Sequence, residues 1–149
     1  RRRPARADAA APAEAALIQS RHHRTCIDGN GMNPGGVHLW ACFDALRAQD
    51  WRLDPASGQI RNAFKHRCLV AKEPRNAGSP LMMRPCSAAS DTWRGDATGR
   101  LVNNFGLCLD TSEPGKRDGG ELHLWKCDKR NPHQEWDFLK KRASAEGRA

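Results

Sequence analysis

The 149-residue sequence contains no apolar run approaching the roughly 18 residues that a membrane span requires. It also lacks a Gly-x-Ser-x-Gly motif, a His-Glu-x-x-His motif and a glycine-rich loop that could cradle phosphate. No two cysteines lie two to four positions apart, the spacing typical of zinc sites. We therefore expect no membrane span, no catalytic residues, no metal site and no cofactor. Because Asn-x-Ser/Thr is absent, no N-linked glycan is expected either.

Charge of one sign dominates only at the two ends of the chain. The formal net charge is +8. Residues 1–16 carry four Arg against two acidic residues, and residues 139–149 carry four basic residues against one acidic residue. The remaining charge is spread along the middle without the basic groove and interleaved aromatics that nucleic acid binding needs. Nucleic acid is therefore an unlikely partner.

Both ends differ in composition from the middle of the chain. Residues 1–16 are half alanine, contain two prolines and show no apolar period, so we expect a disordered or linker-like segment. A transit peptide for an organelle is the alternative, and this is the one segment that could be helical. No signal-peptide pattern occurs, so any targeting segment has been removed or lies upstream. We expect one domain over residues 17–138 and a basic, mobile tail over residues 139–149.

Three copies of one pattern of cysteine and tryptophan run along the chain. Each copy has a first cysteine, a second cysteine 16, 18 or 19 positions later, and then a tryptophan at a near-constant offset. The first cysteines recur after 42 and then 40 residues, which indicates repeated supersecondary units that share one core. The copies are Cys26, Cys42 and Trp51; Cys68, Cys86 and Trp93; and Cys108, Cys127 and Trp136.

Short apolar segments fall in register with these copies and predict strands. Residues 60–62 and 101–103 each precede a first cysteine by about one strand, and residues 18–20 do the same for Cys26. No further strand of this type follows Phe138, so we expect the N-terminal strand to complete the last repeat. Alternating segments at 36–40 and 121–125 are bounded by turn formers such as Ser57-Gly58 and Thr98-Gly99. The pattern predicts an all-β closed fold of about twelve short strands around three core tryptophans.

Six cysteines can pair in fifteen ways, but equivalent repeats should close equivalent loops. We therefore expect one disulfide in each repeat, joining Cys26 to Cys42, Cys68 to Cys86 and Cys108 to Cys127. Such bridges imply a secreted, extracellular or otherwise oxidising location, with an organelle lumen as the alternative. Free core thiols in a reducing compartment are the other interpretation.

Over residues 17–138 the threefold pattern, with Leu-Trp-x-Cys strands and Gln-x-Trp motifs, resembles the ricin B-type β-trefoil lectins. The resemblance implies a β-trefoil of three repeats of about forty residues. It also implies shallow sugar pockets built from an aspartate after the first cysteine, an aromatic residue before the second, and polar groups near Gln-x-Trp. The implied function is a lectin module for galactose-like, GalNAc-like or related glycans, free-standing or attached to a larger enzyme or toxin.

The third repeat carries the full set of pocket residues, and the first repeat carries most of it. A carboxylate can accept paired hydrogen bonds from sugar hydroxyls, and an indole can stack on the C–H face of the ring. We expect the loop of residues 113–120 to fold over the third pocket. In the first repeat, Ala48 stands where the family usually has asparagine. The candidate carbohydrate-binding residues are Asp110, His123, Trp125, His133 and Gln134 in the third repeat and Asp28, His38, Trp40 and Gln49 in the first.

The second repeat has lost this set, since Val70, Arg84 and Asp91 replace the aspartate, the tryptophan and the glutamine. Each candidate also has a structural interpretation: the tryptophans as core residues, the histidines as strand surface, the aspartates as turn caps, and the glutamines as groups that orient loops or aspartates. The alternative function is a non-catalytic trefoil subunit that docks onto a protein partner through its basic tails.

Overall fold

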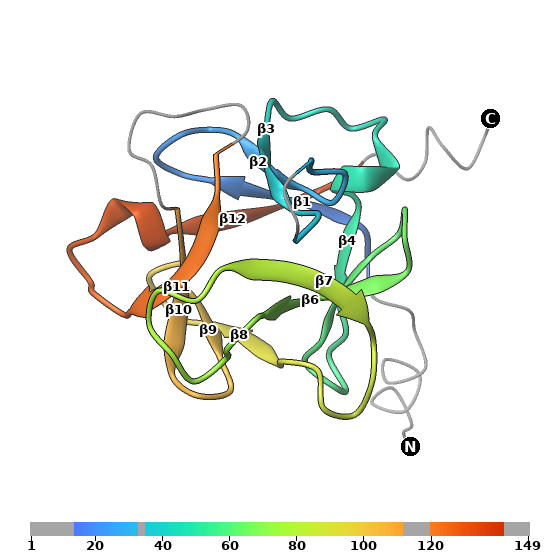
Figure 1. Ribbon diagram of the computed structural model, residues 1–149. Helices are drawn as coiled ribbons and strands as arrows, with labels where there is room; N and C mark the ends of the chain where they lie inside the picture. The colour runs from blue at the N-terminus through green and yellow to red at the C-terminus, as the bar shows by residue number, and fades with distance from the viewer. Residues whose placement is uncertain (1–13, 33–34, 112–119, 142–149) are drawn as a thin grey trace, which may run out of the picture.

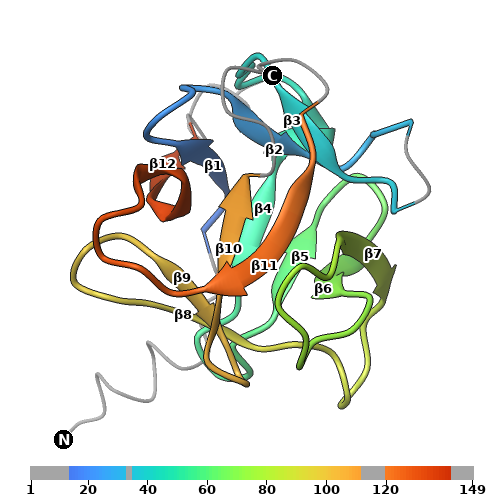
Figure 2. The ribbon, with the colours of Figure 1, turned by 60° about the vertical axis from the view of Figure 1, so that its left-hand side comes forward.

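The computed structural model describes residues 14–32, 35–111 and 120–141, which form twelve β-strands and two short 3-10 helices (Figures 1 and 2). No helix in this part of the chain is long and apolar enough to cross a bilayer. The elements are β1 (Ala16–Ser20), β2 (Cys26–Asp28), β3 (His38–Trp40), η1 (Arg47–Gln49), β4 (Trp51–Leu53), β5 (Ile60–Asn62), β6 (Arg67–Ala71), β7 (Leu81–Pro85), β8 (Trp93–Gly95), β9 (Leu101–Asn103), β10 (Leu107–Thr111), β11 (Leu122–Lys126), η2 (Pro132–Gln134) and β12 (Trp136–Lys140).

The strands repeat three times in groups of four, and the first strand closes the ring with the last. β1 pairs with β12 in antiparallel register from Ala16 opposite Lys140 to Ser20 opposite Trp136, and β1 also contacts β2 and β4. Figure 1 shows β1 and β12 side by side although they come from opposite ends of the domain. This pairing satisfies backbone groups that would otherwise lie on open edges, and it confirms the expected closure.

The strands expected from the sequence are present, and glycines turn the chain between them. β5 and β9 have the bounds that their sequence landmarks suggested, and residues 18–20 lie in β1. Gly58 and Gly99 follow β4 and β8 and adopt φ values of 80° and 90°. Those values lie in the left-handed region, where a side chain on the α-carbon is strained. The two predicted turns therefore depend on glycine.

The three repeat tryptophans sit in the shared core and bind the backbone in the same way. Trp51, Trp93 and Trp136 are almost fully buried. Their indole N–H groups donate to the carbonyl oxygens of the residue after the first cysteine in each repeat, at 2.8, 3.0 and 3.0 Å. Each buried indole thus has its polar atom satisfied while its rings pack on apolar side chains. The acceptors are Ile27, Leu69 and Leu109.

One disulfide staples each repeat, with the pairing that the repeat predicted. In each repeat the first cysteine lies in the second strand, and the second cysteine lies one or two residues after the third strand. Closing loops of this size stabilises the fold by about 3 kcal/mol each in the chain-entropy model. No cysteine is left free, which fits an oxidising environment.

The domain extends slightly past the boundaries expected from the sequence. β1 begins at Ala16, and β12 continues through Leu139 to Lys140 because those residues pair with the start of β1. Lys141 is buried, and its Nζ donates to the carbonyl of Leu46 at 3.1 Å. The first three residues of the expected mobile tail are therefore part of the fold, a correction to the boundary at 139. Residues 1–13, with the expected linker or helix, and residues 142–149 lie outside the described part of the chain.

Candidate functional site

The hairpin of β10 and β11 brings the expected residues of the third repeat together. Its register sets Asp110 opposite His123 and Cys108 opposite Trp125. The Asp110 side chain is buried at the end of β10, where Asp110 is only 4% exposed, whereas Trp125 is 47% exposed. A buried acceptor beside an open aromatic surface is the combination that the sequence analysis sought.

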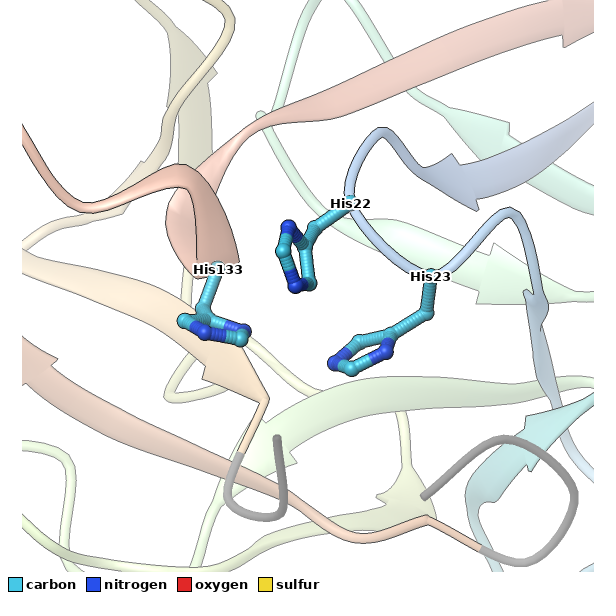
Figure 3. Close-up of side chains that lie close together, drawn as sticks. All are labelled: His22, His23 and His133. Atoms are coloured by element: carbon cyan, nitrogen blue, oxygen red, sulfur yellow. The ribbon is translucent and has the colours of Figure 1, made fainter. Parts of the chain in front are cut away.

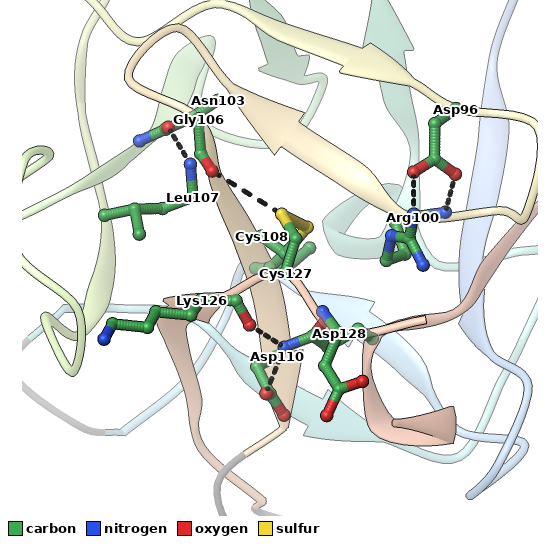
Figure 4. The surroundings of a disulfide bond; sticks show 12 residues. Asp96, Arg100, Asn103, Gly106, Leu107, Cys108, Asp110, Lys126, Cys127 and Asp128 are labelled. Carbon is green, nitrogen blue, oxygen red and sulfur yellow. Dashed lines mark hydrogen bonds and ion pairs between the residues drawn. A yellow bond between two sulfur atoms is a disulfide. The ribbon is translucent and has the colours of Figure 1, made fainter. Parts of the chain in front are cut away.

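Gln134 holds the Asp110 carboxylate in place. Its Nε2 donates to Asp110 Oδ2 at 3.0 Å and to the Lys126 carbonyl at 2.8 Å, while its Oε1 accepts from the Asp128 N–H at 2.9 Å. Asp110, Lys126 and Asp128 lie near the disulfide of the third repeat (Figure 4). Gln134 is fully buried, so every polar atom of the amide is used inside the protein. Of the roles considered for the glutamines, the geometry therefore gives Gln134 both: it orients the aspartate and it binds the backbone of the loop that follows β11.

Asn131 also contacts the carboxylate, and the sequence reasoning missed it. Its Nδ2 donates to Asp110 Oδ2 at 3.3 Å, and its Oδ1 caps η2 by accepting from the His133 N–H at 3.0 Å. Asparagine is a favoured residue at the start of a helix, and Pro132 directly after it also marks such a start. That local signal could have placed Asn131 beside Gln134.

The two histidines of the third repeat lie in different surroundings. His123 is partly buried behind Trp125, with ring centroids 5.9 Å apart, and its Nδ1 has no hydrogen-bond partner among the described residues. Burial lowers the pKa of His123, and the negative charge of Asp110 opposes that shift. His133 is turned toward another part of the chain: its Nδ1 lies 3.1 Å from Thr111 Oγ1, and its ring meets that of His22.

The first repeat reproduces the arrangement with its own residues. β2 and β3 set Asp28 opposite His38 and Cys26 opposite Trp40, and Trp40 is 40% exposed. The His38 and Trp40 rings stack with centroids 5.3 Å apart. Gln49, fully buried, donates from Nε2 to Asp28 Oδ2 at 3.0 Å. The two glutamines therefore have the same role in the two repeats.

Asp28 is held as an anion. Burial disfavours the charged form, but the nearby His38 ring and hydrogen bonds from Gln49 and from the Asn30 N–H outweigh burial and lower the pKa of Asp28. His38 Nε2 lies 3.7 Å from Asp28 Oδ1. At neutral pH the carboxylate is therefore ionised and can accept hydrogen bonds from hydroxyl groups.

The second repeat keeps the scaffold and has a different surface. Val70 lies opposite Met82, and Arg84 lies opposite Cys68 where the other repeats have an exposed tryptophan. Asp91 replaces the glutamine, and its Oδ2 accepts from the Ala71 N–H at 3.0 Å. Burial raises the pKa of Asp91. A hollow of about 150 Å³ lies here, lined by Val70, Ala71, Pro74, Arg84, Pro85, Ser87, Ala89, Ser90 and Asp91.

The loop expected to cover the third pocket falls almost entirely outside the described residues, which resume at Gly120. The Gly120 carbonyl accepts from the Leu39 N–H at 2.8 Å, so the end of this loop is tied to β3 of the first repeat. The two candidate pockets thus belong to repeats that contact each other directly.

The family model described as the ricin-type beta-trefoil lectin domain matches residues 14–142. The chain belongs to this family. The match covers all twelve strands. It includes residues 139–141, which the sequence had placed in a mobile tail. No curated protein gives a significant match to the sequence of this lectin domain.

Solved structures of lectins share the fold of this lectin domain at low sequence identity. The Macrolepiota procera ricin B-like lectin, solved with lactose, has a TM-score of 0.74 at 17% identity over 87% of this chain and 97% of that one. The C-terminal half of an earthworm R-type lectin, solved with GalNAc, has a TM-score of 0.71 at 18% identity over 86% and 99%. The Abrus precatorius agglutinin has 0.70 at 23% identity over 86% of this chain and 47% of that one. At such identities these likenesses establish the fold alone.

Proposed function

We propose that the chain is a non-catalytic carbohydrate-binding module that holds galactose-like or GalNAc-like rings in the third and first repeats. The observation that carries the proposal is the pairing, in these two repeats, of an exposed tryptophan with a buried and oriented aspartate. In the second repeat both are replaced, while the disulfide and core tryptophan remain. Pocket and scaffold residues therefore vary independently within one chain.

The chemistry of the paired groups suits a pyranose ring. The open faces of Trp40 and Trp125 offer a surface for stacking against the C–H face of a sugar. Each aspartate accepts a hydrogen bond from a glutamine, and its remaining lone pairs can accept hydrogen bonds from vicinal hydroxyl groups. The geometry thus supplies both components that recognition of such a ring requires.

The similar solved structures support a galactose-like or GalNAc-like ligand. One is described as a complex with GalNAc and another as a complex with lactose, a galactoside. A shallow pocket with one aromatic residue should bind a monosaccharide with a dissociation constant on the order of 0.1 to 1 mM. Two pockets on one domain raise the apparent affinity for a multivalent glycan through effective concentration. We further propose that the domain works in an oxidising, extracellular or lumenal setting, with glycans as partners.

Trp125→Ala tests the proposal in the third repeat. It should weaken lactose binding at least tenfold, measured by isothermal titration calorimetry on a background in which Trp40 is also replaced by Ala. The melting temperature should change by no more than about 2 °C relative to that background, since nearly half of the side chain is already in solvent. Phe64→Ala is the matched control, because Phe64 is a similarly exposed aromatic residue outside both pockets.

Asp110→Asn is the second arm and is preferable to Asp110→Ala. Alanine would leave the buried Nε2 of Gln134 and the Nδ2 of Asn131 without their acceptor, so lost binding could be confused with lost stability. Asparagine keeps an oxygen acceptor and removes the charge, and should also reduce binding at least tenfold. A correctly folded parent that binds no glycan on an array would reject the lectin proposal in favour of docking onto a protein partner.

A further inference from the structure

Three histidines from opposite ends of the domain meet beside η2. His22 and His23 lie in the turn between β1 and β2, and His133 lies in η2. The ring centroids are 4.8 Å apart for His22 and His23, 4.4 Å for His22 and His133, and 5.2 Å for His23 and His133. Figure 3 shows the three rings turned toward a common space.

The cluster exists because of the way the trefoil closes. The β1 and β12 register sets Ser20 opposite Trp136, and the Arg21 N–H donates to the Glu135 carbonyl at 3.0 Å. These backbone contacts bring the residues directly after β1 against those directly before β12. No spacing in the sequence signals this meeting, so a metal site at these histidines could not be predicted from the sequence.

The ring nitrogens are close to the positions that one metal ion requires. One nitrogen from each ring lies within 4.8 Å of those from the other two. A tetrahedral ion with nitrogen ligands at about 2.0–2.1 Å holds them roughly 3.4 Å apart, so the ring nitrogens must approach one another by up to about 1.4 Å. His22 is exposed and can rotate to do so. The approach therefore requires side-chain rotation and not a change of fold.

The hydrogen bonding of His23 and His133 suits rings that bind a metal ion. His23 is buried, 8% exposed, and its Nε2 is shielded from solvent with no partner among the described residues. A buried ring nitrogen without a partner is costly unless something binds it. On His133, Thr111 Oγ1 lies 3.1 Å from Nδ1, which leaves Nε2 for an ion. A hydrogen bond to the second ring nitrogen is the usual way in which proteins orient a histidine that binds metal.

The surrounding charges favour a cation. Asp110 acts electrostatically on His133, and its negative charge stabilises positive charge at the ring. The nearby guanidinium of Arg21 is neutralised by Asp137, at 2.8 Å, and by Glu135, at 3.7 Å.

We propose that His22, His23 and His133 bind a divalent transition-metal ion, with Zn²⁺ as the physiological candidate, through three imidazole nitrogens. Imidazole suits Zn²⁺, Cu²⁺ and Ni²⁺ and is a poor ligand set for Ca²⁺ or Mg²⁺. Three protein ligands leave a fourth position for water or another small ligand. The ion joins the turn after β1 to η2. His133 then binds the metal ion and not the sugar, in contrast to the role that the sequence predicted for it.

Calorimetric titration of ZnCl₂ into untagged, metal-stripped protein tests the proposal. All six cysteines are in disulfides, so thiolates do not compete for the ion. The parent should bind one Zn²⁺ with a dissociation constant below about 100 µM. His22→Gln and His133→Gln should each weaken binding at least tenfold. His66→Asn should bind as the parent does, because His66 is exposed in the turn between β5 and β6, outside the cluster, and asparagine tolerates its φ of 54°.

His22→Gln decides the outcome even if His133→Gln is unstable. His22 is exposed, and its side chain makes no hydrogen bond with the described residues, so its replacement should leave the fold intact. Circular dichroism confirms that it is folded. Zn²⁺-induced shifts of the imidazole ¹⁵N resonances should be confined to the three cluster histidines. Absence of saturable binding by the parent, or unchanged Zn²⁺ affinity in folded His22→Gln, overturns the proposal.

Discussion

Gln134→Glu isolates the electrostatic role of the glutamine that orients Asp110. The substitution keeps the size and shape of a fully buried side chain, so packing in the core is unchanged. It replaces the Nε2 donor by an oxygen that faces Asp110 Oδ2 at 3.0 Å and the Lys126 carbonyl at 2.8 Å. Two carboxylates at this distance cannot both remain ionised, so the pair retains one proton.

The expected loss of stability follows from that proton. Holding a carboxyl protonated at pH 7, against an ordinary glutamate pKa of about 4.3, costs roughly 1.36 kcal/mol per pH unit, or about 3.7 kcal/mol. One of the two donated hydrogen bonds is also lost, at about 1 kcal/mol. The free energy of unfolding should therefore fall by about 4 to 5 kcal/mol at pH 7.

The sign of the pH dependence is opposite to ordinary acid denaturation. The folded variant binds a proton that its unfolded chain releases above about pH 4.3, so its stability relative to the parent falls as pH rises from about 4.5 to 7. Near pH 4.5 only the lost hydrogen bond and a small protonation term remain, about 1 to 1.5 kcal/mol. The gap between parent and variant should narrow by about 3 kcal/mol over this range.

Urea denaturation of the oxidised protein at pH 7.0 and pH 4.5 measures both quantities, provided that the m-value is unchanged. Gln49→Glu is the matched comparison in the first repeat. Its penalty at pH 7 should be smaller, because His38 lies 3.7 Å from Asp28 and can donate to the carboxylate pair. A gap for Gln134→Glu that is under about 1 kcal/mol at pH 7, or equal at both pH values, refutes the reasoning.

Two further predictions concern the scaffold. Although burial opposes its ionisation, hydrogen bonds from Thr98 and Arg100 lower the pKa of Asp96 to about 2, so Asp96→Asn should cost about 1 kcal/mol at pH 7 once solvent screening is allowed for. In urea titrations that cost should persist down to about pH 4 and vanish as pH falls to about 2; a pH-independent cost would contradict the ion-pair explanation. Trp136→Phe removes the indole N–H that binds the Leu109 carbonyl and should lower the free energy of unfolding by about 2 to 3 kcal/mol without altering the sugar affinity; thermal unfolding within about 2 °C of the parent would argue against this hydrogen bond as a support of the core.

The parts of the fold that the sequence could predict are those marked by cysteine and tryptophan, whose usual roles in such a repeat are disulfide bonding and core packing. Each cysteine pair and each core tryptophan recurs in register, and alternating apolar segments bounded by turn formers lie between them, so the disulfides, the hairpins and the closing strand could be predicted. The pocket aspartates and tryptophans could be named because the resemblance to the ricin B-type lectins implies them, and their loss from the second repeat separates them from the scaffold residues.

What sequence could not predict depends on contacts between segments that share no pattern. Asn131 reaches Asp110 only because η2 folds back over the end of β10. His22 meets His133 across more than a hundred residues, through the register of two strands. The end of β12 was misplaced because Leu139 and Lys140 run directly into a basic, polar segment, and only pairing with β1 makes them part of a strand. Distant register is a tertiary property, and composition carries little information about it.

The pairing of Ala16 with Lys140 has a mechanical consequence. The chain enters and leaves the domain through adjacent residues of one antiparallel ladder, so tension applied through flanking segments would open the β1 and β12 pairs one after another from that end. A ladder loaded in this way resists far less force than one sheared along its length, because its hydrogen bonds break in sequence and not together. The disulfides would then bear the remaining load and keep each hairpin closed after the ring has opened.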